Sequence, residues 1–570
     1  MAKASAETSH LERTISQQLN GAQGSEDEPT SIYRVGWRTQ MAIVALSMAN
    51  ACAAIANTTN TIIRFQVMSL GDAKNASWIA NANFLMTLAF GPVLGSLSDR
   101  FGKRWFIIVA TVFGVVGSCI SGSAQKTTVV IGGNILTGLA NAGCIMGTPS
   151  AQEVTPNRLR PWTMGFGQCL ASIAVIGGTI GAGAFVKFHT WRWSYYLNAI
   201  FYGTTFVLVS LFYHPPPPGL RRHGARLQSL VSKIDYVGIL IFTGSLASII
   251  IGVTWGGTTY AWDSPQCLAT LIIGCVGLGL FGIWEGFVVS EGILDHRLFQ
   301  SRNFPILIFV CVIDGMLLLG VNVLFSQEIP TLFTVDPVQI SVILTPYLAS
   351  SAFGCIPAGA LMARTKSYRV MLVAALLWCA LFTGLMAMLN PSRLSWAYAF
   401  SAMFGIGTAV TTVIPIVALA LSVPSFLLGT AGTFSVSCRA LGGIIGITIF
   451  TAIYNNKMAV RLPADVGAVL GRAGQSALLP DTLGALQLGD PSALQHVAGL
   501  PESLIPSILD AQTDANVYSW KYVWIAIAAI VTANAIAACF LESVAGRMNN
   551  HIESALEESE AREKQKGAVL

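Results

Sequence analysis

Three ionisable side chains stand inside long apolar stretches of this 570-residue sequence. Asp314 follows eight apolar residues, Glu328 comes shortly before a proline, and Arg439 lies in a later apolar stretch. A carboxyl group in a low-dielectric cavity can bind and release a proton near neutral pH, and charges placed there are functional candidates by default. Asp314 is therefore our first candidate for reversible protonation and Glu328 the second. A structural ion pair with a neighbouring helix is the alternative for Asp314, whereas Arg439 could neutralise Asp314, contact a substrate or pack between helices.

A short polar turn carries a second group of candidates. Its acid, Asp99, can accept hydrogen bonds from amides at a helix N-terminus and can pair with arginine. Glu153 and Arg158, in a later polar loop, are possible partners. The other candidates in the turn are Gly95, Arg100, Gly102, Lys103 and Arg104. The alternative is that the basic residues only orient the chain, which explains the lysine and the last arginine but neither the acid nor the glycines.

The composition indicates what must position these residues. The sequence is 53% hydrophobic and only 11% charged, and apolar runs of about 20 residues, each long enough to cross a bilayer, recur along it. These runs must be helices because lipid satisfies no backbone amide. The net charge of +5 is spread over short turns, which does not favour nucleic-acid binding. The cysteines lie mostly inside apolar runs, as packing residues do, and no spacing predicts a metal site or a cofactor.

About fourteen membrane helices are expected, in an all-α fold. Residues 1–35 lack the apolar core of a signal peptide, so the first helix must itself direct insertion. The predicted organisation is a cytoplasmic tail (1–38), a six-helix half (39–213), a linker (214–233), two inserted helices (234–288), a second six-helix half (304–545) with a long outer loop (455–520), and a cytoplasmic tail (546–570). The outer loop is expected either to form short helices over the outer mouth or to be a tolerated insertion.

Two internal echoes support a duplication. The turn that begins at Gly95 has a degenerate repeat that begins at Gly359, again between apolar runs. The glycines of the fifth predicted helix, Gly177 and Gly181, are echoed in the thirteenth by Gly442, Gly443 and Gly446. Both echoes are offset by eight helices, as expected when a six-helix unit is duplicated around two inserted helices. Such glycines are expected to let neighbouring helices approach closely.

Lysine and arginine are concentrated in alternate loops, which places the turn at Asp99 and both termini on the cytoplasmic side. The sequons at Asn57 and Asn75 fall at or in the first outer loop and are candidate glycosylation sites. We expect a multi-pass protein of the plasma membrane, with a vacuolar or vesicle membrane as the alternative.

The turn 95–104 resembles the signature loop of the major facilitator superfamily. The stretches 97–105, 153–158, 191–198 and 439–443 are similar to those of fungal drug:proton antiporters with fourteen spans, above all trichothecene-type efflux pumps and their siderophore-transporter relatives. The resemblance implies a fold of two pseudo-symmetric halves. It also implies that Gly95, Asp99, Arg100, Gly102, Lys103 and Arg104, with Glu153 and Arg158, form an inner gate that locks the halves together.

This sequence departs from the family pattern at three places. Ala182 replaces the proline of a glycine motif in helix 5, Asn134 stands where an arginine is often found in helix 4, and Thr59 lies near the place of an aspartate in helix 1. The first departure puts the antiporter kink in question.

The resemblance implies a secondary transporter, not an enzyme, that exports a small apolar or amphipathic toxin, secondary metabolite or drug by proton antiport. Its expected partners are that substrate, the proton and the lipid bilayer, and a monomer is expected. An uptake carrier for siderophore iron and a transporter-like sensor that does not transport are the alternatives. No ATP-binding loop appears in the sequence.

Overall fold

The computed structural model describes residues 36–71, 76–215, 235–256, 260, 262–289, 292, 296–424, 427–487, 491–497 and 499–548. Contacts divide the chain into two units, Met1–Trp37 and Arg38–Leu570, and the fold is that of the second. Most of the predicted N-terminal tail, linker and C-terminal tail, together with Asn75, lies outside the described residues.

The described part is helical and contains no β-strand, only one isolated β-bridge. Its longer helices are α2 (Trp37–Ile55), α3 (Ile63–Leu70), α4 (Ala76–Phe101), α5 (Lys103–Gly122), α6 (Thr127–Cys144), α7 (Gly147–Glu153), α8 (Arg160–Phe188), α9 (Arg192–Phe212), α12 (Tyr236–Trp255), α13 (Pro265–Ile283), α14 (Asn303–Gly315), α15 (Val321–Leu332), α16 (Pro337–Thr365), α17 (Tyr368–Met386), α18 (Leu394–Ser422), α19 (Leu428–Arg472), α20 (Leu479–Gln487) and α21 (Ile505–Ala538).

Within the described residues, 13 helices are long and apolar enough to cross a membrane. Helix α4, 26 residues long, is not among them. It ends in the polar signature turn and packs against α6 and α19 inside the bundle. Together these helices cover all the predicted spans, so the predicted all-α fold of about fourteen membrane helices is confirmed.

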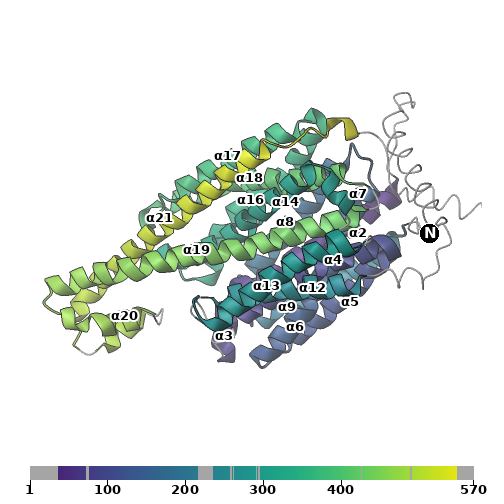
Figure 1. Cartoon of the computed structure of the whole chain (residues 1–570). Coiled ribbons are helices and arrows are strands. Elements are labelled where there is room, and N and C mark those ends of the chain that lie inside the picture. Colours follow the sequence, from purple (N-terminus) through teal and green to yellow (C-terminus); the bar gives the residue numbers. More distant parts are fainter. Residues whose placement is uncertain are drawn as a thin grey trace, which may run out of the picture. The chain divides into compact units, whose positions relative to one another are not determined.

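The two halves meet through two equivalent helix pairs (Figure 1). Helix α4 packs along α19, and α8 packs along α16. In the predicted numbering these are helices 2 with 13 and 5 with 10. Helix 10 is the counterpart of helix 2 and helix 13 that of helix 5, so the duplication exchanges the two pairs. A duplicated unit with a pseudo-two-fold axis produces this arrangement.

Glycines allow these close approaches, but not all of the predicted ones take part. A side chain at Gly442 would meet the backbone of Val312, and one at Gly446 would lie 2.9 Å from the Met316 Cβ. Gly443 similarly faces Leu319, which lies in the turn directly after α14. These three glycines therefore lie where α19 closely approaches residues 312–319.

Gly177 and Gly181 lie less close to neighbouring helices than predicted. No atom of a neighbouring helix lies within 4 Å of a Cβ built at Gly177, and the nearest atoms to one at Gly181 are 3.7 Å away or more. The glycine of α8 that faces α2 is Gly178, where a Cβ would be 2.8 Å from Ile55. Successive residues of a helix point about 100° apart, so adjacent glycines of one motif face different directions and the contact with α2 falls at Gly178.

The outer segment is more ordered than predicted. Helix α19 continues to Arg472 and α21 already begins at Ile505, so much of the predicted loop 455–520 is helical. Figure 1 shows the two helices running side by side, with α20 near their far ends. Val466 and Leu470 of α19 share a small apolar core with Ile508 of α21. Apolar residues repeat on one face here while the other face is polar, a pattern that a search for uniformly apolar spans misses.

Candidate functional site

A buried ion pair joins α14 to α19. The Oδ2 atom of Asp314 lies 2.6 Å from Nη2 of Arg439. The aspartate is 1% and the arginine 7% exposed. Arg439 also donates a hydrogen bond to the carbonyl of Thr412 on α18, at 3.4 Å. The first-choice acid and the clearest intramembrane cation of the sequence are therefore brought together.

The backbone explains how the two charges come so close. A Cβ at Gly315, the residue after Asp314, would collide with the Arg439 carbonyl, and one at Gly442 would collide with Val312. The two glycines thus place the helix backbones in contact on either side of the pair. Directly after Gly315 the helix widens into the π-helical turn η4 (Met316–Gly320), and such turns are frequent at functional sites.

The pair can couple protonation to a change in packing. Protonating Asp314 would leave the guanidinium of Arg439 buried without its counterion, which is far costlier than leaving the pair intact. The arginine must then find another partner or reach water. Reversible protonation of Asp314 would therefore be energetically linked to the position of Arg439 on α19.

Glu328 is a separate buried acid. It lies on α15, is 1% exposed, and both of its carboxyl oxygens lie 3.1 Å from the indole nitrogen of Trp524 on α21. Among the described residues no cation pairs with it. Fourteen residues separate it from Asp314, about 21 Å of helix, so the structure does not bring the two acids together.

At one end of the bundle, Asp99 caps α19. Its Oδ2 atom accepts hydrogen bonds from the backbone amide of Thr430 at 2.7 Å and from the Thr430 hydroxyl at 2.8 Å. Lys103 lies 3.2 Å from Asp99 and also pairs with Glu153. We call Asp99, Lys103, Glu153 and Thr430 the latch. Asp99 thus accepts hydrogen bonds near the N-terminus of α19 and joins the two halves, whereas the contact of Glu153 with Lys103 lies within the first half.

Close packing surrounds the latch. A Cβ at Gly95 of α4 would lie 3.1 Å from the Gly429 carbonyl of α19. Gly102 separates α4 from α5 with a φ of 100°, which residues with a side chain rarely adopt. The glycines predicted in this turn therefore have structural roles.

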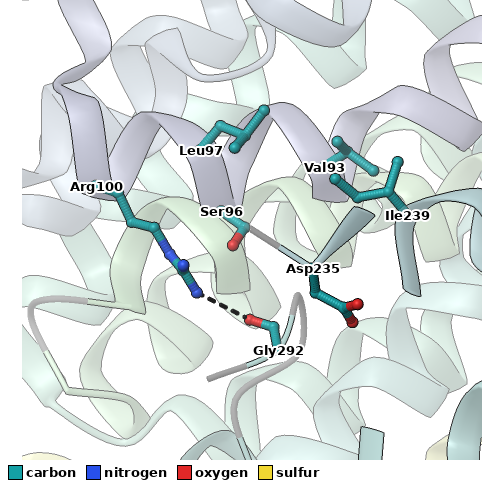
Figure 2. A pocket seen from close by; sticks show the side chains of 7 residues that line it. All are labelled: Val93, Ser96, Leu97, Arg100, Asp235, Ile239 and Gly292. Atoms are coloured by element: carbon teal, nitrogen blue, oxygen red, sulfur yellow. Dashed lines mark hydrogen bonds between the residues drawn. The ribbon is translucent and has the colours of Figure 1, made fainter. Parts of the chain in front are cut away.

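The other basic residues of the motif point elsewhere. Arg100 donates to the carbonyl of Gly292 at 3.3 Å, and Figure 2 shows it across a cleft from Asp235. Arg104 donates to the Ser210 carbonyl of its own half at 3.0 Å. Arg158 is exposed, and in the described part of the chain no ion pair connects it to the latch.

Sequence reasoning missed two further contacts between the halves. Arg160 is 2% exposed and donates to the Gln152 carbonyl at 3.0 Å and to the Ala420 carbonyl of α18 at 3.5 Å. At the other end of α8, Lys187 donates to Asp336 at 2.8 Å. That hydrogen bond, together with the Val338 amide, lowers the pKa of Asp336. The Asp-Pro pair that starts α16 was a capping signal in the sequence, whereas the partner of Arg160 is a distant backbone carbonyl that no pattern reports.

At the positions that depart from the family pattern, uncharged side chains form ordinary hydrogen bonds or pack within a helix. The Asn134 amide donates to the Ile79 carbonyl of α4 at 2.6 Å, and Thr59 donates to the Ala56 carbonyl of its own helix. At Ala182, α8 runs through as one helix of 29 residues. Asn57 lies inside the short helix η1 (Ala56–Ile62) and donates to the Ala53 carbonyl, so it does not present its amide as an exposed loop sequon does.

Comparisons with known proteins identify the family of the chain and support its fold. A family model described as the fungal trichothecene efflux pump (TRI12) matches residues 10–567. The chain is 27% identical to MFS transporter L2 of Phoma sp. over 92% of this chain and 86% of that one. It is 26% identical to MFS-type transporter pydD of Acremonium sp. (94% and 92%) and 27% identical to efflux pump FUS6 of Gibberella fujikuroi (76% and 78%). The crystal structure of the human organic anion transporter MFSD10 (TETRAN) superposes with a TM-score of 0.50 at 11% identity, over 86% of this chain and 99% of that one, which supports the fold alone.

Proposed function

The chain belongs to the fungal trichothecene efflux pump family, and from the geometry of its buried ion pair we propose that it is a proton antiporter that exports a small apolar or amphipathic toxin, secondary metabolite or drug. The observation that carries the proposal is the Asp314–Arg439 pair, an acid and a base held at the same depth of the bundle. Several relatives named as efflux pumps support the direction of transport.

In this mechanism the halves rock about a midplane site. Asp314 takes a proton when the site opens to the outside and releases it when the site opens to the cytoplasm. Protonation frees Arg439, and the α14–α19 contact relaxes because its charge attraction is lost. Glu328, which has no paired cation among the described residues, is the second candidate on the proton path.

The latch acts as the inner gate of this cycle. It closes the cytoplasmic end while the pump faces outward, because Asp99 then holds the N-terminus of α19. Gly95 and Gly102 permit the closed contact, and Glu153 holds Lys103 in place. We place this end and both termini in the cytoplasm from the lysine and arginine bias of the loops, in a monomer of the plasma membrane.

The test is transport by the purified full chain in liposomes, with a tritiated trichothecene as the probe. An imposed pH gradient should drive its accumulation, and a protonophore should abolish it. Asp314→Asn should lose at least tenfold of the gradient-driven rate while it still folds, because the amide cannot exchange a proton. Asp465→Asn is the matched control and should behave as wild type. It removes an acid that pairs with Arg461 in the outer part of α19, beyond the predicted span.

Full gradient-driven transport by Asp314→Asn would refute the assigned role of this acid. Transport unaffected by collapse of the gradient would refute proton antiport altogether. Accumulation of ferric siderophores in cells that express the chain would favour the uptake carrier instead.

A further inference from the structure

A strip of cations and tyrosines crosses the paired helices α19 and α21, far along α19 from the latch. It consists of Lys457 and Arg461 of α19 and Tyr518 and Tyr522 of α21, and we call it the cation–tyrosine strip. Nζ of Lys457 lies 4.4 Å from the centre of the Tyr522 ring, and Cζ of Arg461 lies 5.0 Å from the centre of the Tyr518 ring. Each cation is therefore held over the face of an aromatic ring on the neighbouring helix.

The strip is ordered, yet most of its hydrogen-bond donors are still available. The two tyrosine rings have their centres 5.0 Å apart and their hydroxyl oxygens 3.2 Å apart. Nε of Arg461 lies 2.8 Å from Oδ2 of Asp465, and the arginine side chain is 46% exposed. That contact leaves the N–H donors of both Nη atoms for another acceptor. Within the described part of the chain, no carboxylate forms an ion pair with Lys457.

The strip lies where the lipid-facing surface of the bundle ends. Lys457 and Tyr518 are each two residues inside the predicted outer loop 455–520, next to the apolar runs of α19 and α21. On α21, Ile525 and Ile536 follow Tyr518 at spacings that keep all three side chains on one face of the helix. The two isoleucines are 46% and 61% exposed, so this face contacts lipid. The strip is therefore at the level of the lipid headgroups, where tyrosine and basic residues are commonly found.

The charges around the strip have a fixed order. Asp465 follows Arg461 by four residues on α19, and Asp514 precedes Tyr518 by four residues on α21. Both acids therefore lie one helical turn farther from the bilayer. The cations are on the membrane side and the carboxylates on the water side, an order that attracts an anion to the headgroup level and repels it farther out.

We propose that the cation–tyrosine strip binds the phosphate of an anionic phospholipid and so anchors α19 at the membrane surface. Lys457 and Arg461 are about 6 Å apart along the helix axis, so the oxygens of one phosphate can accept hydrogen bonds from both. A tyrosine hydroxyl can donate to the same group. The acyl chains of the bound lipid then lie along the exposed isoleucines of α21.

The anchor bears on the transport cycle through α19. Arg461 lies 22 residues after Arg439 on the same helix, about 33 Å along its axis. A lipid bound at the strip restrains the helix that the ion pair is proposed to move. Lipid binding itself requires neither proton coupling nor a given direction of transport, so its test is independent of the test of the proposed function.

The test is native mass spectrometry of the purified full chain, titrated with dioleoylphosphatidylglycerol. Dioleoylglycerol has the same acyl chains without the phosphate and is the comparison lipid. The wild type should bind its first phosphatidylglycerol with a Kd about tenfold or more below that for dioleoylglycerol, because two cations contact the phosphate. An excess of inorganic phosphate should not displace the lipid, since it lacks the acyl chains that contact α21.

The decisive variant carries both Lys457→Gln and Arg461→Gln. Its Kd for phosphatidylglycerol should rise about 25-fold, about 5-fold for each basic residue removed at the membrane surface. The variant with Lys457→Arg and Arg461→Lys keeps both charges and should bind as wild type. Arg472→Gln removes a charge from the same helix 11 residues farther along and is the matched control. An unchanged melting temperature in detergent shows that each variant is folded.

A spin label locates the bound lipid on the chain. Val460 is 75% exposed and adjacent to Arg461, so a nitroxide at position 460 lies beside the strip. In the background without the exposed cysteines, phosphatidylglycerol should reduce the mobility of this label. The same lipid should leave the label unchanged when Lys457→Gln and Arg461→Gln are present.

Four results would overturn the inference. Three concern the site: equal Kd values for wild type and the double glutamine variant, an equal loss of affinity in Arg472→Gln, or a label at position 460 that does not respond to phosphatidylglycerol. The fourth concerns the ligand: dioleoylglycerol that binds as tightly, or inorganic phosphate that displaces the lipid, would show that the strip does not recognise a phospholipid.

Discussion

Removing the carboxyl group of Asp99 should open the latched end of the transporter. In Asp99→Ala the N-terminus of α19 loses two charge-assisted hydrogen bonds, from the amide and the hydroxyl of Thr430. Loss of a helix cap costs about 1 kcal/mol, and a hydrogen bond to a charged group contributes about 1.5–3 kcal/mol. Lys103 keeps Glu153 as a partner, so no buried charge is orphaned. We therefore expect the latched state to lose about 2 kcal/mol, a shift of about 30-fold in the equilibrium.

Such a shift is large enough to see directly. If the open state is populated at about 1% in wild type, it should rise to about a quarter in the variant. Spin labels at positions 105 and 370, on exposed residues of the two halves, report the distance between them in a background without the exposed Cys119, Cys275 and Cys539. Pulsed electron paramagnetic resonance should show a second, longer distance between the two labels.

The control for this prediction is Arg104→Gln. It removes a charge from the same turn, but its backbone contact is with Ser210 of the same half. It should leave the distance distribution unchanged. An unchanged distribution in Asp99→Ala, or an equal change in the control, would refute the view that Asp99 holds the halves together.

Two further predictions test helix contacts. Gly442→Ala should destabilise the protein by about 1–3 kcal/mol, because its Cβ would collide with the Val312 backbone. Gly177→Ala, in open space inside α8, should keep or slightly raise the melting temperature, because alanine is the better helix former. Equal melting temperatures for the two variants would contradict this packing. The lowered pKa of Asp336 means that its contact with Lys187 contributes above the ordinary aspartate pKa and is lost only as the pH falls through the lowered value. A distance reporter between α8 and α16 at this end should therefore be constant at mildly acidic pH and change in strong acid, and Asp336→Asn should remove that change; a transition near neutral pH would contradict the assignment.

The sequence predicts helices well where the bilayer alone selects residues. The spans follow from uniform apolarity, which needs no knowledge of neighbours. The same criterion fails beyond the membrane, where α19 continues past Asn455 as an amphipathic helix whose core contains Val466. There the signal is periodicity, and it is weaker because one face is polar.

Site residues were predictable when the chemistry was local or when a charge stood alone in apolar surroundings. A buried Asp314 needs a cation, and Arg439 is the only strong candidate in the later apolar runs, so the pair could be anticipated although its 2.6 Å contact could not. Arg160 could not be found, because its partner on α18 is a backbone carbonyl that any sequence supplies. Whether Gly177 or Gly178 faces a neighbouring helix depends on the rotation of α8 about its axis. Packing decides that rotation, and a glycine motif does not.

One helix connects the two charged regions of the molecule. Thr430, held by Asp99, and Arg439, held by Asp314, are nine residues apart on α19, about 13.5 Å of continuous helix. A helix is stiff over that length, so a tilt that releases Arg439 from Asp314 also moves the amide of Thr430 relative to Asp99. Of the two sides of the latch, only Thr430 is on a helix of the ion pair, so a movement of α19 on protonation of Asp314 would reach the latch through that helix. Gly315 of α14 and Gly442 of α19 hold the two helices in close contact beside the ion pair. At a looser crossing, the Arg439 side chain could leave a protonated Asp314 without any movement of α19.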